Sequence, residues 1–172
     1  MTNVKTRRSN KPVTQFACNA LEDWLEGTNP GFRGTRENTT VDYICGRYQY
    51  FKVYLWKDEI LSIIALNGDI QTIRVSVGNF FAAEDGSPSL TTRERLNGLL
   101  DLMSYYQIIP DHVHVFRDKE TRICYFGRGD QKIAVGKNYA KTVLIRPDSN
   151  VFEIQVSDME MPQMYIRSLD EE

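Results

Sequence analysis

Two histidines, His112 and His114, are the residues of this sequence that could most directly hold a metal ion or move a proton. They are two positions apart in an alternating segment, so both are expected on one face of a strand. Asp111 could add a carboxylate, but a zinc site needs three or four ligands, and no CxxC or HExxH spacing supplies the others. Val113 and Val115 would take the opposite face, which puts the histidines on the wet side. The sequence therefore predicts no metal and no cofactor.

Signatures of covalent or nucleotide-dependent catalysis are missing from the sequence. There is no GxSxG elbow, Walker loop or Rossmann fingerprint. The glycine-containing segments 127–130 and 136–138 lack the strand–loop–helix context that lets a loop hold phosphate, so they are expected to be hairpin turns. Cys18, Cys45 and Cys124 are far apart and have no neighbouring histidine or basic cluster that would lower a thiol pKa. We expect a non-enzymatic protein without catalytic residues.

A row of aromatic residues marks one face of the predicted strand segment 41–56. Alternation places Phe51, Val53 and Leu55 on one side. The other side carries a cation among aromatic rings, namely Tyr48, Tyr50, Lys52, Tyr54 and Trp56. The favoured interpretation is that this side is buried under a helix, for example the one that contains Trp24. If it is exposed instead, it predicts a protein-binding surface or a platform for stacking bases.

Basic residues are spread through the last part of the chain, with aromatic residues between them. The cations are Arg128, Lys132, Lys137, Lys141 and Arg146, and the interleaved rings are Tyr125, Phe126 and Tyr139. Such a pattern suits a nucleic-acid track. It also suits exposed strand edges, which proteins protect with lysine. Nucleic acid is therefore the alternative partner.

The start of the second predicted helix offers an anion site. Backbone N–H groups there, together with Thr92, Arg93 and Arg95, could hold an anion. The favoured interpretation is a capped, solvated helix start, because Thr91 to Glu94 match a capping box.

Helices and strands must position these candidate residues, and the spacing of apolar residues predicts where those helices and strands are. A helix is expected over 14–26, ended by Gly27, and the segment 27–34 is expected to be loop. The segment 41–56 has strand composition with a possible break at Gly46. Turns at 57–59 and 67–69 would join it to strands 60–66 and 70–77; Asn67-Gly68 is the stronger turn signal.

The second half of the chain is expected to hold one helix and more strands. The helix should run from about Thr91 to Tyr106. Strands are expected at 112–117, 121–126, 132–135, 142–145 and 151–156. Because strands come in runs and do not alternate with helices, we predict an α+β fold: a mainly antiparallel sheet, made of a meander plus C-terminal hairpins, with two amphipathic helices.

The composition indicates which class of protein this is and where in the cell it is expected. The 172 residues carry a net charge of -2, with 41% hydrophobic residues and a mean hydropathy of -0.42, as in an ordinary globular protein. The apolar run 60–66 is too short to span a membrane, and the first residues lack the apolar core of a signal peptide. We expect a flexible basic arm over 1–12, one domain over 13–157 and an acidic tail over 158–172, in a reducing cytoplasm and without a membrane partner.

Three segments of residues 38–104 share features with a known family: Asn38 to Val41, the strand pair around 53–55 and 63–65, and above all the helix start Thr91-Thr92-Arg93-Glu94-Arg95-Leu96-Asn97. In these segments the chain resembles small uncharacterised proteins of tailed bacteriophages. The resemblance transfers no catalytic residue. It implies a phage accessory protein, and such proteins often bind and block a host factor, for example a component of host defence. A host protein is accordingly the expected partner.

Overall fold

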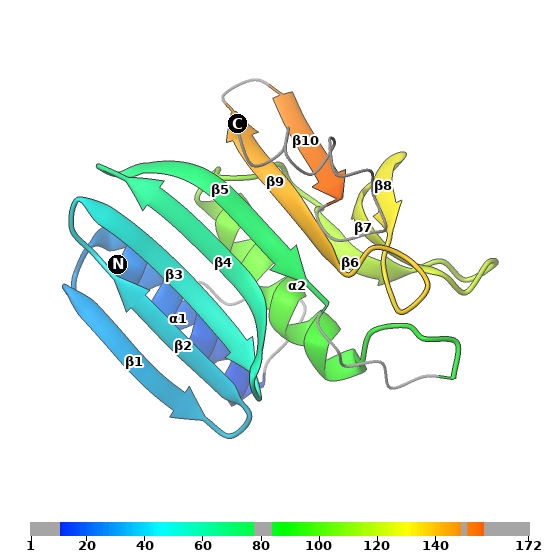
Figure 1. The fold of residues 1–172 in the computed structure, drawn as a ribbon, viewed down its shortest axis with the longest axis horizontal. Coiled ribbons are helices and arrows are strands. Elements are labelled where there is room, and N and C mark those ends of the chain that lie inside the picture. The colour runs from blue at the N-terminus through cyan, green and yellow to red at the C-terminus, as the bar shows by residue number, and fades with distance from the viewer. Residues whose placement is uncertain (1–10, 78–83, 149–150, 157–172) are drawn as a thin grey trace.

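The computed structural model describes residues 11–77, 84–148 and 151–156, which form two helices and ten strands (Figure 1). In chain order the elements are α1 (Pro12–Glu26), β1 (Gly31–Arg36), β2 (Thr39–Ile44), β3 (Tyr48–Leu55), β4 (Asp58–Leu66), β5 (Asp69–Ser76), α2 (Leu90–Tyr105), β6 (His114–Arg117), β7 (Cys124–Arg128), β8 (Gln131–Ala134), β9 (Thr142–Asp148) and β10 (Val151–Val156). The first ten residues of the predicted basic arm and the whole predicted acidic tail lie outside the described residues.

The described strands form two antiparallel sheets. The large sheet has the order β1-β2-β3-β4-β5-β9-β10, and the small sheet has the order β6-β7-β8. Strands β1 to β5 are neighbours in chain order, and β2 to β5 are the predicted meander. Strands β6–β7 and β9–β10 pair as hairpins. The α+β class, with mainly antiparallel sheet and two helices, is confirmed.

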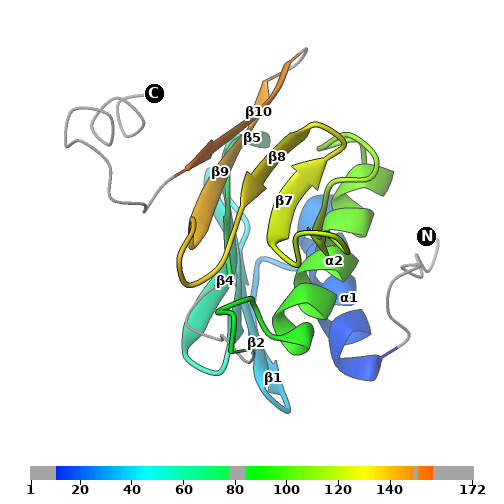
Figure 2. The same ribbon diagram turned by 90° about the vertical axis from the view of Figure 1, so that its right-hand side faces the viewer.

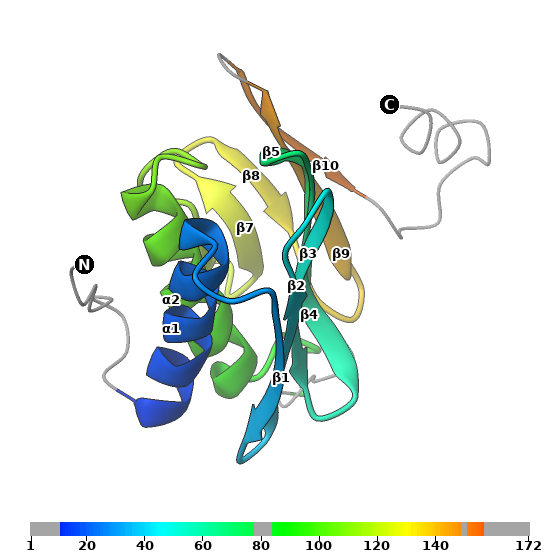
Figure 3. The same cartoon turned by 90° about the vertical axis from the view of Figure 1, so that its left-hand side faces the viewer.

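Both helices cover the same face of the large sheet. Figures 2 and 3 show that sheet edge-on, with α1 and α2 on one side and the small sheet on the same side, between α2 and the β9–β10 end. The covered face, called the inner face below, supplies the sheet's part of the core: Val41, Tyr43, Phe51, Val53, Leu61, Ile63, Ile73, Val75, Val143 and Ile145. The opposite face, called the outer face, carries no helix from the described part of the chain.

Helix α1 ends where its sequence predicts and begins at Pro12, two residues before the predicted start. Pro12 occupies the first turn, where a missing N–H costs nothing, and Gly27 closes the helix in the left-handed conformation (φ 67°). The Trp24 ring packs 5.8 Å from the Phe51 ring, and its Nε1–H donates to the Ile44 carbonyl at 3.1 Å. The indole thus has both an apolar contact and a hydrogen-bond acceptor. Together they orient α1 on the inner face.

Two predictions about the meander are corrected. The segment 27–34 is not all loop, because Gly31 to Gly34 form most of β1, which pairs with β2 along its whole length. A Cβ on Gly34 would lie 2.5 Å from the Phe32 ring, so this glycine makes room for that ring. The predicted turn at 57–59 is Trp56-Lys57, because Asp58 already pairs with Leu55. The Asn67-Gly68 turn and the break near Gly46 are confirmed.

Helix α2 begins differently from its prediction. Its N-cap is Ser89, whose hydroxyl accepts from the Thr92 N–H at 3.1 Å, so the capping box at Thr91–Glu94 is wrong. Glu94 instead forms an ion pair with Lys11 at 3.1 Å. Its apolar stripe is confirmed, but α2 is buried on more than one side because it packs against α1, β4 and β6. In the described part of the chain, no helix is long and apolar enough to cross a membrane.

A buried carboxyl at the end of α1 makes stability depend on pH. Burial, and then the charge of Glu26, raise the pKa of Glu22, although the Tyr106 hydroxyl acts in the opposite direction. The folded state therefore binds this proton more tightly than the unfolded chain does, and stability falls as pH rises through the raised pKa. We expect Glu22→Gln to increase the free energy of unfolding at pH 7 more than at pH 4, as measured by urea unfolding.

The control for Glu22→Gln is Glu120→Gln, which removes an exposed carboxylate from the β6–β7 turn. It should change stability by less than about 0.5 kcal/mol at both pH values. Equal gains for the two variants at both pH values would contradict a specific effect of the buried carboxyl.

Candidate functional site

The aromatic row of β3 lies on the outer face. Tyr48, Tyr50, Lys52 and Tyr54 alternate with the buried Phe51 and Val53, and the Trp24 helix covers the buried side. The interpretation that a helix buries this row is therefore wrong. The physical reason is that both aromatic side chains of α1 pack on the inner face, Trp24 on Phe51 and Phe16 on Phe32. Figures 2 and 3 show both described helices on the inner side of the sheet.

Strand pairing builds an apolar patch around this row. Tyr50 lies between Ile44 of β2 and Ile64 of β4, and Tyr48 lies opposite Leu66. The Tyr48 and Tyr50 rings are 6.4 Å apart. Ile44, Tyr48 and Leu66 are among the exposed large hydrophobic side chains, with Tyr48 at 55%. We call these five residues the outer patch. It is continuous because side chains directly opposite in neighbouring strands touch.

A charged row borders the outer patch. Directly opposite positions run across five strands in a single line: Arg33, Asp42, Lys52, Ser62 and Arg74. Asp42 is held by Arg33 at 2.9 Å, and it also accepts from the Tyr50 hydroxyl at 3.4 Å. Lys52 lies 5.1 Å from the centre of the Tyr50 ring. The row carries three cations and one carboxylate, so it is net basic.

Trp56 does not belong to the outer patch. It occupies the β3–β4 turn with a left-handed backbone (φ 57°), and its N–H donates to the Asn38 carbonyl at 2.7 Å. A shift of register between Val53 and Tyr54, where Ile60 is the extra residue of β4, comes just before this turn. Trp56 is exposed, but the aromatic row predicted as a unit ends at Tyr54.

The predicted basic series is divided between the two sheets. Arg128 and Lys132 lie on the β7–β8 hairpin, and Lys137 lies in the loop that follows. Lys141 comes just before β9, and Arg146 is within β9 of the large sheet. The interleaved Phe126 is fully buried, so it cannot contact a partner. These cations do not form one continuous track, and their nucleic-acid role stays a prediction.

One part of that series does form a compact group. Lys132 Nζ is 4.5 Å from the Tyr125 ring centre and 6.0 Å from the Phe116 ring centre, and the two rings are 5.9 Å apart. These contacts are cation–π geometries between neighbouring strands. The lysine therefore covers the rings that a base would need for stacking.

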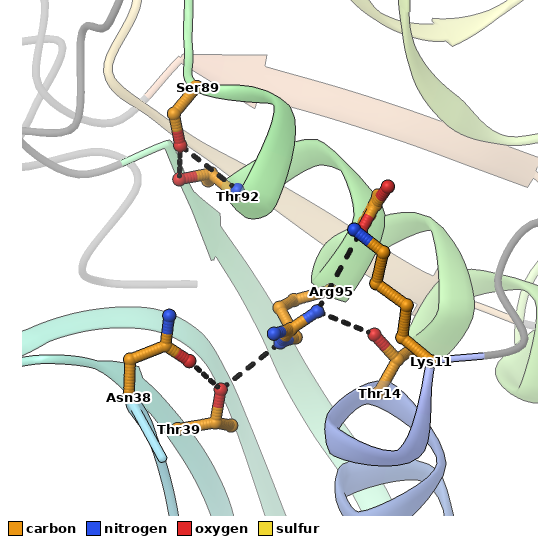
Figure 4. Close-up of polar contacts among 8 residues, drawn as sticks. Lys11, Thr14, Asn38, Thr39, Ser89, Thr92 and Arg95 are labelled. Atoms are coloured by element: carbon orange, nitrogen blue, oxygen red, sulfur yellow. Dashed lines mark hydrogen bonds and ion pairs between the residues drawn. The ribbon is translucent and has the colours of Figure 1, made fainter.

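The three predicted anion-binding residues do not converge. Figure 4 shows Arg95 between α1 and β2, where its Nη1 donates to the Thr14 hydroxyl at 2.8 Å and its Nε to the Thr39 hydroxyl at 3.1 Å. Thr92 is fully buried and shares a hydrogen bond with the Ser89 hydroxyl. Arg93 lies on another side, where its charge acts on Cys124. Arg95 thus joins three elements inside the molecule, and burial lowers its pKa.

The two histidines are also separated. His112 is exposed in a turn with φ 67°, whereas His114 begins β6 and is buried, with its Nε2 2.6 Å from the Asp101 carboxylate. The expectation that both lie on the wet face is wrong for His114, because α2 packs against the start of β6. The described residues contain no group of three or more His, Cys, Asp or Glu side chains placed to hold a metal ion.

The cysteine side chains are set up for packing. All three are free, and Cys18 and Cys124 are buried. Burial, followed by the charges of Asp101 and Glu22, raises the pKa of Cys18 to about 12. Burial also raises the pKa of Cys45 and, as the largest of several influences, that of Cys124. A thiolate nucleophile is therefore disfavoured at each position at neutral pH.

Sequence reasoning missed seven members of this surface, namely Ile44, Ile64, Leu66, Arg33, Asp42, Ser62 and Arg74. Alternation within their strands could have assigned each to a face, but only the cross-strand register brings them beside Tyr50 and Lys52. The outer patch with its basic row is the strongest candidate site in the described residues. No significant match connects the chain with a family model, a curated protein or a solved structure.

Proposed function

We propose that the chain is a non-enzymatic, phage-type accessory protein that binds and blocks an acidic protein in the host cytoplasm. The observation that carries this proposal is the outer patch, an exposed apolar surface bordered by the net basic row. An apolar centre with tyrosines and a charged rim is the usual build of a protein interface.

The charge distribution supports an acidic partner. Within the described residues neither Lys52 nor Arg74 forms an ion pair, whereas the one carboxylate of the row is occupied by Arg33. The helix side has the opposite character, because α1 ends with Glu22, Asp23 and Glu26 and contains no basic residue. Complementary charge increases the association rate and excludes unsuitable partners.

A protein partner suits the outer patch better than nucleic acid does. Three of its five residues are aliphatic, namely Ile44, Ile64 and Leu66. Aliphatic side chains do not stack on bases as aromatic rings do. The cations available near it are too few for the phosphate contacts that dominate nucleic-acid affinity. Nucleic acid is therefore an outcome that the experiment must be able to detect.

The test is site-specific photo-crosslinking in host lysate, followed by mass spectrometry and binding measurements with the purified product. A crosslinker replaces Tyr48 in one variant and Tyr105 at the end of α2 in the other. The two side chains are 55% and 57% exposed, so accessibility is matched. We expect one acidic protein to be crosslinked from position 48 and not from position 105.

Two surface variants then test the patch and the row. Tyr48→Ser with Leu66→Ser should weaken the affinity for the purified partner about tenfold or more, because interface aromatic residues contribute most of the binding energy. Lys52→Glu with Arg74→Glu should weaken it and reduce its salt dependence. Crosslinks that are equal at both positions, or that contain only nucleic acid, would refute the proposal.

A further inference from the structure

A pocket of about 340 Å³ opens where three loops meet beside the small sheet. It is lined by residues 85–87 before α2, by residues 121–124 leading into β7, and by Val135, Asn138 and Tyr139 after β8. We propose that this pocket binds a small organic anion that carries a flat ring. The inference is independent of the outer patch, because the pocket is built by different elements.

The walls of the pocket are fixed by hydrogen bonds between loops that are distant in sequence. The Lys137 N–H donates to the Gly86 carbonyl at 2.8 Å, and the Val135 N–H donates to the Cys124 carbonyl at 2.9 Å. A Cβ on Gly136 would lie 2.9 Å from the Gly86 oxygen, in a backbone conformation (φ 143°) that favours glycine. The two loops can approach this closely because Gly136 has no side chain. A pocket with such walls is formed before a ligand arrives.

The inside of the pocket offers an apolar floor and one ring. Cys124 and Val135 are buried members of the core, and Ile123 lies beside them. Tyr139 lines the pocket and is 41% exposed, and its N–H donates to the Gly136 carbonyl at 3.1 Å. A half-exposed tyrosine over an apolar floor is suited to contact with a flat ring.

The anion preference comes from Arg122. Its backbone has an uncommon left-handed conformation (φ 63°), held by its N–H donating to the Asp118 carbonyl at 2.9 Å and its carbonyl accepting from Arg117 Nε at 3.2 Å. Within the described residues its guanidinium makes no hydrogen bond or ion pair, so its donors are available to a ligand. A guanidinium binds carboxylate or phosphate with two parallel hydrogen bonds.

One carboxylate, that of Asp85, also lines the pocket and would oppose an anion. It is already occupied, since it accepts from the Ser87 hydroxyl at 2.7 Å and the Ser87 N–H at 3.0 Å, and it forms an ion pair with Arg117. The Ser87 hydrogen bonds, and then the nearby arginines, lower the pKa of Asp85. With Asp85 balanced by Arg117, the charge of Arg122 is left over. The Asn138 amide adds a further donor and acceptor at the rim.

Two kinds of small molecule share this chemistry, nucleoside monophosphates and aromatic carboxylates. The volume is near the lower end of the range for ligand pockets, roughly 300–1,000 Å³, which favours a ligand with one ring system. The test is a titration of the whole chain, followed by amide chemical shifts, with AMP, UMP, 4-hydroxybenzoate and inorganic phosphate as separate probes. We expect at least one ring-containing probe to shift the amides of 121–124 and 138–139 in a saturable manner.

Two variants and one control make the test specific. Arg122→Gln should weaken the binding of that probe about tenfold or more, and Tyr139→Ala should weaken it several-fold, whereas Arg128→Gln, an exposed arginine outside the pocket, should leave it unchanged. Inorganic phosphate that binds as tightly as the ring-containing probes would overturn the need for a ring. The absence of saturable shifts with every probe, or equal weakening by Arg128→Gln, would overturn the site.

Discussion

Replacing Asn97 with alanine is expected to lower the free energy of unfolding by about 3 kcal/mol, because it leaves two buried backbone groups unpaired. The Asn97 side chain donates from Nδ2 to the Val115 carbonyl at 3.0 Å and accepts from the Val115 N–H at 2.8 Å. Val115 belongs to β6, the edge strand of the small sheet that faces α2. The asparagine therefore takes the place of a neighbouring strand at that position.

The size of the effect follows from what the variant cannot replace. Both residues are buried, so water does not reach the groups that alanine would leave without a partner. Each unpaired buried group costs about 1–3 kcal/mol. For a chain of this length a loss of about 3 kcal/mol corresponds to a fall in melting temperature of about 6–12 °C. Thermal and urea unfolding would both measure it.

The matched control is Asn19→Ala, an exposed asparagine in the middle of α1. Alanine is the better helix former, so this variant should be neutral or slightly more stable. Asn97→Asp separates the two hydrogen bonds, because it keeps the acceptor and removes the donor. An Asn97→Ala variant as stable as Asn19→Ala would show that the amide does not tie α2 to the small sheet.

Local signals predicted the elements whose ends are set by local chemistry. Pro12 and Gly27 set the ends of α1, and Asn67-Gly68 set the turn between β4 and β5. In contrast, β1 was missed because its glycines have low strand propensity, and it is a strand because six residues of β2 pair with it. Ser89 was missed because the Thr91–Glu94 pattern, which begins two residues later, is equally compatible with an N-cap.

The candidate sites depend on contacts that no local pattern encodes. Alternation showed that β3 has two faces, but the Trp24 contact decides which of them α1 covers. The outer patch needs the register of three strands. The pocket needs three segments of the chain, and the first two, 85–87 and 121–124, are 34 positions apart (121 − 87). Arg95 was predicted at a solvated helix start because its distant hydroxyl partners are not visible in the local sequence.

The second large effect on stability is expected at Arg95. Removing the hydroxyls that accept its hydrogen bonds should lower the free energy of unfolding more than removing the arginine itself. Arg95 is 5% exposed, and two fully buried hydroxyls, those of Thr14 and Thr39, accept its hydrogen bonds. Glu94 is 3.9 Å away and is closer to Lys11, at 3.1 Å. The guanidinium therefore depends on the hydroxyls, and Thr14→Val with Thr39→Val would leave a buried charge without them.

We expect this double variant to lower the free energy of unfolding by about 3 kcal/mol, since each hydrogen bond to a charged group contributes about 1.5–3 kcal/mol. Valine has nearly the same shape as threonine, so packing changes little.

Adding Arg95→Met should then restore most of the loss, because an apolar side chain among valines needs no acceptor. Urea unfolding of the wild-type, double and triple variants, with equal dependence on denaturant, would measure both steps. A triple variant as unstable as the double would mean that the threonine hydroxyls stabilise the junction of α1, β2 and α2 by themselves. Recovery in the triple variant would show that the threonines are needed there because the arginine is buried.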